Sequence, residues 1–173
     1  MFNKIQKLFS LFPEEWDPKF VTIDEIYSAS TLITEVANME PETQINGIVY
    51  IVDFSDLTFS KSLQLTPGRA IRILDFIQGN IPGRVKGFHI VNQPRIIQPI
   101  FSAAKQFFTT KYGPRICMHG TNYESLHQYI APECLPKRYG GLLDMELSYG
   151  RETYQLLEPF NDYFVELQTC GFK

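Results

Sequence analysis

The chain lacks the cysteine patterns that build disulfide frameworks and structural metal sites. Its three cysteines, Cys117, Cys134 and Cys170, are an odd number, and none belongs to a CxxC pair. This usage is typical of a reducing compartment and does not indicate a zinc site. Glycine-rich phosphate loops and GxSxG elbows are also missing from the sequence, which excludes two common classes of enzyme motif. We therefore expect neither a metal nor a cofactor.

A basic excess and a long apolar run are missing as well. The net charge is −3, whereas nucleic-acid-binding domains usually carry a positive excess. Residues 1–12 contain two lysines and a short apolar stretch, which is too brief for a signal peptide or a membrane span. The 173 residues, of which 44% are apolar and 20% charged, suit one globular domain. We expect a cytoplasmic protein without a nucleic-acid partner.

The chain does contain an alternation of strand-like runs and helical stripes. The run at 48–52 is apolar without alternation, as expected for a strand covered on both faces. Thr22 and Glu25 form a capping box in front of a helical stripe. Strands are expected at 48–52, 85–91 and 115–119, and helices at 22–37, 66–77, 96–111 and 123–130. This order predicts an α/β fold with a mainly parallel β-sheet flanked by helices.

Few residues suggest catalysis. Cys117 and His119 lie two apart and share one face of an expected strand, so they form either a nucleophile pair or, as we favour, a buried inert thiol beside a structural histidine. A third histidine on a strand, His89, is also interpreted as structural. Asp53 and Asp56 follow a strand and either bind a cation or, as we favour, cap the next turn.

Two of the expected helices, at 66–77 and 96–108, are unusually apolar for helices on a protein surface. They either cover the sheet or form the wall and the lid of an apolar ligand pocket. Ser30 and Thr34 lie one turn apart on the first helix and either orient a ligand or are ordinary helix residues. The sequence pattern leaves both interpretations open.

Four basic residues precede or begin two of the expected strands. They are Arg84, Lys86, Lys111 and Arg115. Because parallel strands begin at one edge of their sheet, these charges should converge there, opposite the edge where α/β enzymes place their sites. The cluster is either a docking patch for anionic lipid headgroups or a solvated basic edge.

Six segments between Trp16 and Gly141 carry a resemblance to a known family. They are WDP at 16–18, ETQING at 42–47, IPGRVKGFH at 81–89, VNQP at 91–94, MHG at 118–120 and LPKRYGG at 135–141. Together they resemble the CRAL-TRIO lipid-binding domain, in particular the branch of alpha-tocopherol transfer protein and cellular retinaldehyde-binding protein.

The resemblance implies a lipid pocket closed by a mobile amphipathic lid helix within 92–115, and a cleft for phosphoinositide headgroups. The cleft positions fall on the same four basic residues, Arg84, Lys86, Lys111 and Arg115. Phe76, Ile81 and Phe88 differ in size from the family residues at these positions, so the resemblance does not imply that this chain binds the same ligand as those family members. The implied ligand-lining residues are Tyr27, Ser30, Thr34, Ile48, Ile73, Phe76, Ile77, Ile81, Val85, Phe88, Ile97, Ile100, Phe101, Ala104 and Phe107.

The two ends of the chain depart from the family pattern. We expect an atypical segment at 1–15 and the lipid-binding domain at 16–173, without the helical domain that usually precedes it. Apolar residues among 2–12 are spaced as in an amphipathic helix, which would contact a membrane or cover a sheet edge. A further packing helix is expected around 154–164.

The resulting prediction is a protein, not an enzyme, that binds and transports a tocopherol-, retinoid- or similar isoprenoid-like lipid inside the cell and docks peripherally on phosphoinositide membranes. The alternative is a phosphoinositide-recruited membrane domain that transfers nothing. An enzyme that uses Cys117 and His119 is the third and least favoured hypothesis. The sequence does not indicate an oligomeric state.

Overall fold

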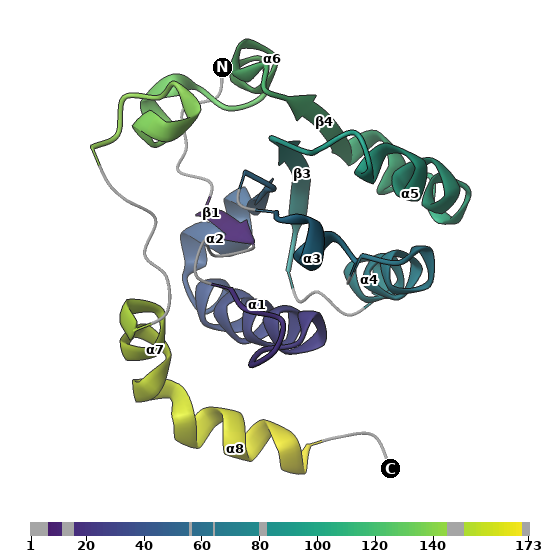
Figure 1. Cartoon of the computed structure of the whole chain (residues 1–173). Helices are drawn as coiled ribbons and strands as arrows, with labels where there is room; N and C mark the ends of the chain where they lie inside the picture. Colours follow the sequence, from purple (N-terminus) through teal and green to yellow (C-terminus); the bar gives the residue numbers. More distant parts are fainter. Residues whose placement is uncertain are drawn as a thin grey trace.

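The computed structural model describes residues 7–11, 16–55, 57–63, 65–79, 83–144 and 151–170. Its centre is a parallel sheet of four strands in the order β1-β2-β3-β4 (Figure 1). The strands are β1 (Lys7–Leu11), β2 (Ile48–Asp53), β3 (Val85–Val91) and β4 (Ile116–Gly120). The predicted parallel α/β fold is confirmed, and β3 has the predicted boundaries.

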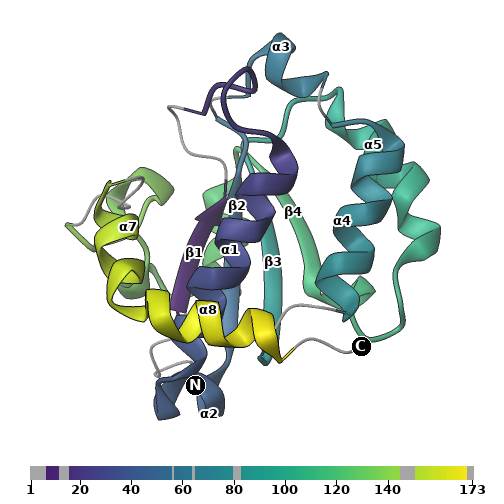
Figure 2. The ribbon, with the colours of Figure 1, turned by 90° about the horizontal axis from the view of Figure 1, so that it is seen from below.

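The helices between the strands lie on one side of the sheet, where the longer ones cover its face and the short ones lie at the ends of the strands (Figure 2). This is expected when sequential parallel strands are joined by crossovers of one hand. The capping box of Thr22 and Glu25 begins the first of them. They are α1 (Ile23–Asn38), α2 (Pro41–Asn46), α3 (Phe59–Ser62), α4 (Pro67–Gly79) and α5 (Ile97–Ala104), with α5 continued by a 3₁₀ turn at Lys105–Phe107 and β4 preceded by another at Gly113–Arg115.

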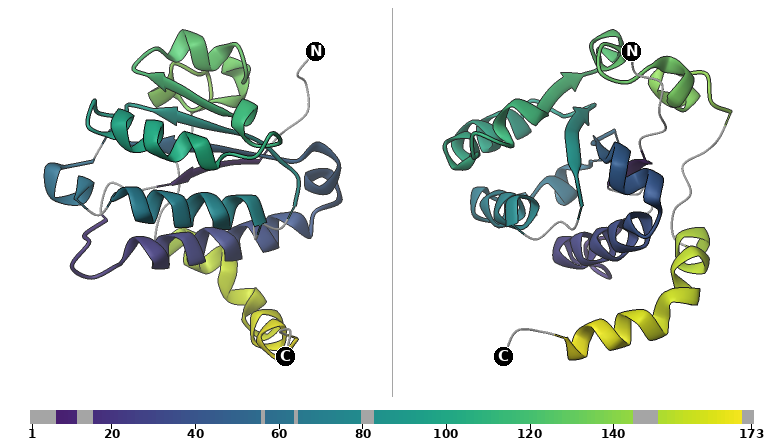
Figure 3. Two further views of the ribbon diagram at one scale, coloured as in Figure 1. Left: turned by 90° about the vertical axis from the view of Figure 1, so that its right-hand side faces the viewer. Right: turned by 180° about the vertical axis from the view of Figure 1, so that it is seen from behind.

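The opposite face of the sheet, which we call the outer face, is covered by the chain that follows β4 (Figure 3). This part consists of α6 (Tyr123–His127) and the 3₁₀ turns Pro132–Cys134 and Lys137–Tyr139. Val49, Ile51 and Val91 of the sheet are buried there against Leu126, Ile130, Leu135 and Tyr139. Apolar side chains of the sheet are therefore buried on both of its faces, as the uninterrupted apolar run at 48–52 predicted.

Two expectations about helices near the ends of the sequence need correction. Lys7–Leu11 forms β1 and pairs with β2, so the helix expected across 2–12 is wrong for these residues, because backbone pairing with the sheet outweighs the helical spacing. Residues 1–6 and 12 lie outside the described part. The expected tail helix is two helices, α7 (Arg151–Leu157) and α8 (Asn161–Thr169), separated by a turn at Glu158–Phe160.

Among the helices that the structure describes, none has both the length and the apolar character required to cross a bilayer.

Candidate functional site

The face of the sheet beneath α1, α4 and α5 carries a continuous apolar cluster, which we call the inner layer. Strand β2 contributes alternate side chains to it, as the two-residue period of a strand requires. Strand β3 does so at Phe88 and Ile90, and an irregularity in its register with β2 brings Val85 to the same face. Its buried members are Trp16, Ile23, Ile48, Tyr50, Phe54, Leu65, Val85, Phe88, Ile90, Ile97 and Tyr112, with Ile26, Tyr27, Val52, Leu57, Ile100, Phe101 and Ile116 partly buried against them.

Most of the predicted ligand-lining residues that the structure describes lie in or beside this layer. Ser30 is half-buried and its hydroxyl donates to the carbonyl of Ile26 at 2.8 Å, and Phe107 is 44% exposed at the rim. Ile73, Phe76 and Ile77 belong to α4, and Ile81 lies outside the described residues. The residues brought together are Tyr27, Ile48, Val85, Phe88, Ile97, Ile100 and Phe101, with Thr34 and Ala104 buried as well.

The inner layer contains a polar pair that crosses from helix to sheet. The hydroxyl oxygens of Thr34 and Tyr50 lie 2.7 Å apart, and the ring of Tyr50 stacks on Phe88 with the centroids 5.0 Å apart. Burial raises the pKa of Tyr50 to about 12 and raises the pKa of Tyr27 as well. Both phenols therefore remain neutral near pH 7 and can donate a hydrogen bond inside an apolar layer.

Sequence reasoning overlooked Tyr50, although a signal was present. Tyr50 is two residues after Ile48 in the same strand, and strand residues two apart share a face. Ile90 follows Phe88 by the same rule, and both Tyr50 and Ile90 are buried in the inner layer. Trp16 and Tyr112 are also members of it, but each lies outside the regular elements and no periodicity points to them.

Helix α5, the predicted lid, lies closed on the sheet. Ile97 and Ala104 are buried in it, with exposures of 1% and 2%. The side chain of Gln78, on α4, bonds the chain just after the C-terminal end of α5. Its amide donates to the Phe107 carbonyl at 3.1 Å and accepts from the Thr109 backbone N–H at 2.7 Å. The helix was expected to extend to 111 but ends at Ala104, and Gln78 bonds the backbone just beyond it.

The four predicted basic residues gather where β3 and β4 begin. Arg115 donates from Nη1 to the carbonyl of Val85, the first residue of β3, at 2.7 Å. Lys111 and Arg115 both lie over the ring of Tyr112, at 4.9 and 5.9 Å from its centroid. Arg84 immediately precedes β3 and Lys86 is its second residue. We call Arg84, Lys86, Lys111 and Arg115 the basic edge.

The opposite, carboxyl edge of the sheet is occupied by a hydrogen-bonded network around buried Asp53. Its Oδ1 accepts from the backbone N–H of Ser55 and from Asn92, each at 2.9 Å, and its Oδ2 accepts from Tyr139 at 3.0 Å. Arg138 forms an ion pair with the same carboxylate at 3.3 Å. The favoured turn-capping role of Asp53 is confirmed, while Asp56 lies outside the described residues.

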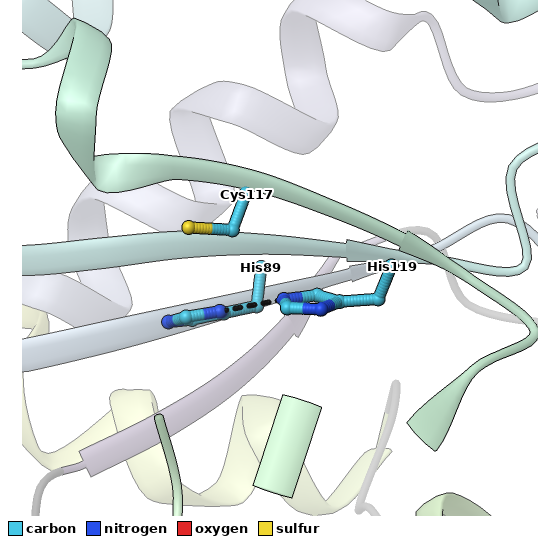
Figure 4. A group of neighbouring side chains, drawn as sticks. All are labelled: His89, Cys117 and His119. Atoms are coloured by element: carbon cyan, nitrogen blue, oxygen red, sulfur yellow. Dashed lines mark hydrogen bonds between the residues drawn. The ribbon is translucent and has the colours of Figure 1, made fainter. Parts of the chain in front are cut away.

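Cys117 and His119 share a face of β4, as predicted, and point to the outer face beside His89 (Figure 4). His89 and His119 are buried, and the cluster belongs to the opposite side of the sheet from the inner layer. Burial lowers the pKa of His89 to about 4, with a further contribution from neighbouring His119, and burial also lowers the pKa of His119. Both imidazoles are therefore neutral near pH 7.

Comparison with known proteins agrees with this architecture. Residues 4–141 match the family model of the CRAL/TRIO domain. Clavesin-2 of Homo sapiens is 38% identical over 138 residues, which cover 80% of this chain and 42% of the relative. Clavesin-1 of Xenopus laevis is 38% identical over 158 residues, which cover 91% of this chain and 47% of the relative. The chain thus spans less than half the length of these relatives.

The resemblance drawn from the six short segments is confirmed by both comparisons. A parallel sheet with crossover helices on one face, and a match over most of the sequence, lead to one conclusion: the chain belongs to the CRAL/TRIO domain family, a family of lipid-binding and lipid-transfer proteins.

Proposed function

We propose that the chain binds a small hydrophobic lipid of tocopherol, retinoid or similar isoprenoid type in the inner layer and transports it inside the cell. The observation that carries the proposal is the position of α5, whose apolar side chains Ile97, Ile100 and Phe101 lie on the same sheet face as α1. A mainly apolar site with few polar groups suits such a ligand. The hydroxyl oxygens of Thr34 and Tyr50 can orient it by accepting a hydrogen bond from a ligand hydroxyl.

The energetics favour complete enclosure of the ligand. Apolar surface leaves water with a gain of about 25 cal/mol per Å², so a lipid that buries roughly 400 Å² gains about 10 kcal/mol. Enclosure requires a movable wall, and α5 is the element proposed for it. We propose no catalytic step and no cofactor for this function.

The basic edge is proposed to hold phosphoinositide headgroups and to place the protein peripherally at membranes. Lys111 and Arg84 are exposed, and basic residues near an anionic surface contribute about 1 kcal/mol each. Tyr112 connects the two functions, since it is buried in the inner layer while Lys111 and Arg115 lie over its ring. Docking then biases α5 between its closed and open states through differential affinity.

The test is mass spectrometry of the lipid extracted from the purified, folded chain. One apolar species at close to one molecule per chain supports the proposal and identifies the ligand. A folded chain that carries no lipid and takes none up from vesicles containing tocopherol or retinaldehyde contradicts lipid transport. It would favour the alternative, a membrane-recruited domain that binds phosphoinositide through the basic edge and transfers nothing.

A further inference from the structure

Three metal-ligating side chains converge on the outer face of the sheet. His89 of β3 is the register partner of Cys117 of β4, and His119 follows two residues later. One ligand atom from each residue lies within 4.8 Å of the other two. Figure 4 shows the two imidazoles side by side with the thiol of Cys117 next to them.

The two histidines are already in contact through their ring nitrogens. Nδ1 of His89 lies 2.9 Å from Nε2 of His119. The remaining ring nitrogen of His119, Nδ1, is hydrogen-bonded to the hydroxyl of Ser125 on α6. A histidine that binds a metal usually has its second nitrogen held in this way, because the outer partner fixes the ring orientation and the tautomer.

The two histidines of the cluster are buried, whereas its cysteine is partly open to solvent. His89 and His119 are 4% and 8% exposed, and Cys117 is half-buried. The ring of Tyr129, itself 50% exposed, lies 5.1 Å from the His89 ring and 5.7 Å from the His119 ring. A hydrogen bond with the Cys117 thiol raises the pKa of the Tyr129 phenol. An ion therefore has access past Tyr129 and Cys117.

We propose that His89, Cys117 and His119 together bind one borderline-soft transition-metal ion, with Zn²⁺ as its representative. Imidazole nitrogen and thiolate sulfur are the ligands that zinc prefers, whereas Mg²⁺ and Ca²⁺ require oxygen. Three protein ligands leave a fourth position for water, as in open zinc sites.

The present geometry needs only a small adjustment. Zinc–nitrogen distances of about 2.0–2.1 Å and a zinc–sulfur distance of about 2.3 Å place tetrahedral ligand atoms about 3.3–3.7 Å apart. The two nitrogens, now 2.9 Å apart, would separate slightly, and the sulfur would approach them. On binding, the Cys117 thiol releases its proton to solvent. Each imidazole stays neutral, but the ring that now donates in the bond between the two histidines moves its proton to its other nitrogen, so that the nitrogen facing the metal is free to bind it.

Metal and lipid would occupy opposite faces of the sheet, so this inference is independent of the proposed lipid transport. The ion would join the edge strand β4 to β3 and to α6 through Ser125. The competing explanation is a hydrogen-bonded histidine pair that binds nothing. The two explanations differ in Cys117, since the histidine pair does not need the thiol and the metal site does.

The test is titration of the full chain with Co²⁺ and Zn²⁺ after removal of metals by a chelator. Bound Co²⁺ should give a thiolate-to-cobalt charge-transfer band and intense tetrahedral d–d bands, at one ion per chain. Zn²⁺ should abolish both bands and raise the melting temperature. Absence of the charge-transfer band at saturating Co²⁺ would overturn the proposal.

The variants assign the ligands. Cys117→Ser should remove the charge-transfer band, and Cys117→Ser and His89→Gln should each weaken Zn²⁺ binding by more than 100-fold. Ser125→Ala, which removes an outer partner, should weaken it by about 10- to 100-fold. Cys134→Ser and Cys170→Ser are the matched controls and should bind as the unaltered chain does. Equal binding by Cys117→Ser and Cys134→Ser would refute the site.

A measurement without substitutions covers the case in which a variant does not fold. Zn²⁺ should slow alkylation of Cys117 in the unaltered chain at least 10-fold and leave exposed Cys170 unaffected. Equal alkylation rates of Cys117 with and without Zn²⁺ would contradict metal binding at this thiol.

Discussion

Thr34 on α1 and Tyr50 on β2 are joined by a buried hydrogen bond of 2.7 Å that crosses the inner layer. The Thr34 hydroxyl also bonds the Ser30 carbonyl at 2.7 Å. A carbonyl only accepts, so the single hydroxyl proton of Thr34 goes to Ser30 and the phenol of Tyr50 is the donor to Thr34. The direction of this hydrogen bond is thus fixed by the helix backbone.

We expect Thr34→Val to lower the free energy of unfolding by about 1–2 kcal/mol, because it removes a buried hydrogen bond at nearly constant volume. Tyr50→Phe should have a similar cost, and the double variant should cost less than the sum. Thr31→Val is the control, since the Thr31 hydroxyl bonds only within α1, to the Tyr27 carbonyl at 3.0 Å. Denaturant unfolding measures all four variants, and additive effects of the two substitutions would argue against the pairing.

Alkaline pH should destabilise the chain through the same tyrosine. Burial raises the pKa of Tyr50 from 10 to about 12, because the folded state favours the neutral phenol. The contribution of this neutral phenol to the free energy of unfolding is complete below pH 10 and is lost as the pH rises toward 12. The loss attributable to Tyr50 should reach about 2 kcal/mol at the upper end of this window. Ultraviolet titration should show a phenolate that forms near pH 12 in the unaltered chain and is missing in Tyr50→Phe. Tyr154 is exposed, so Tyr154→Phe should leave this ionisation near pH 12 in place.

Gln78→Ala should loosen the lid. The substitution removes both hydrogen bonds that α4 makes to the backbone beyond α5, and the loss of about 1–2 kcal/mol corresponds to local opening that is roughly 5- to 30-fold more frequent. Hydrogen exchange at the Phe108 amide measures it, because this amide bonds the Lys105 carbonyl at 3.2 Å and not Gln78 itself. Gln106→Ala provides the comparison, because the Gln106 amide bonds Ala103, within the lid itself. Unchanged protection of Phe108 would show that Gln78 does not restrain the lid.

Substitutions at the basic edge should weaken binding to vesicles that contain phosphoinositide. Lys111→Ala should lower the affinity about 5-fold, and a double variant with Arg84→Ala about 30-fold, if each charge contributes about 1 kcal/mol. The effect should shrink at high salt. Lys137→Ala removes an exposed lysine from the segment over the outer face and serves as the control. A loss of the same size for Lys137→Ala would indicate unspecific attraction.

Gly47→Ala should destabilise the fold by about 2–4 kcal/mol. Gly47 has φ of 82° and ψ of −174°, and a Cβ there would lie 2.4 Å from the Arg84 carbonyl oxygen, which accepts from Ile48 at 2.9 Å. Gly68 near the start of α4 has open space around it, so Gly68→Ala should be neutral or stabilise by up to about 1 kcal/mol. Thermal unfolding separates the two. A Gly47→Ala chain as stable as Gly68→Ala would disprove the steric argument.

Local patterns were sufficient for most of the fold. The apolar run of β2 and the capping box of α1 each indicate their element within a few residues, because backbone propensity and face periodicity are local properties. The order of these elements then implied a parallel sheet, and the sheet implied that basic residues at strand starts gather at one edge. The six short segments between Trp16 and Gly141 were enough to identify the family.

Contacts between distant residues decided the rest. Lys7–Leu11 became β1 because β2 offered a partner, and the chain beyond α5 is bonded to Gln78 about thirty positions away.

The grouping of His89 with Cys117 and His119 required the register of β3 against β4. A single sequence records which face of an element is apolar, but it does not record which residue of another element will lie opposite. That depends on pairing and packing across long separations, and only the tertiary structure supplies it.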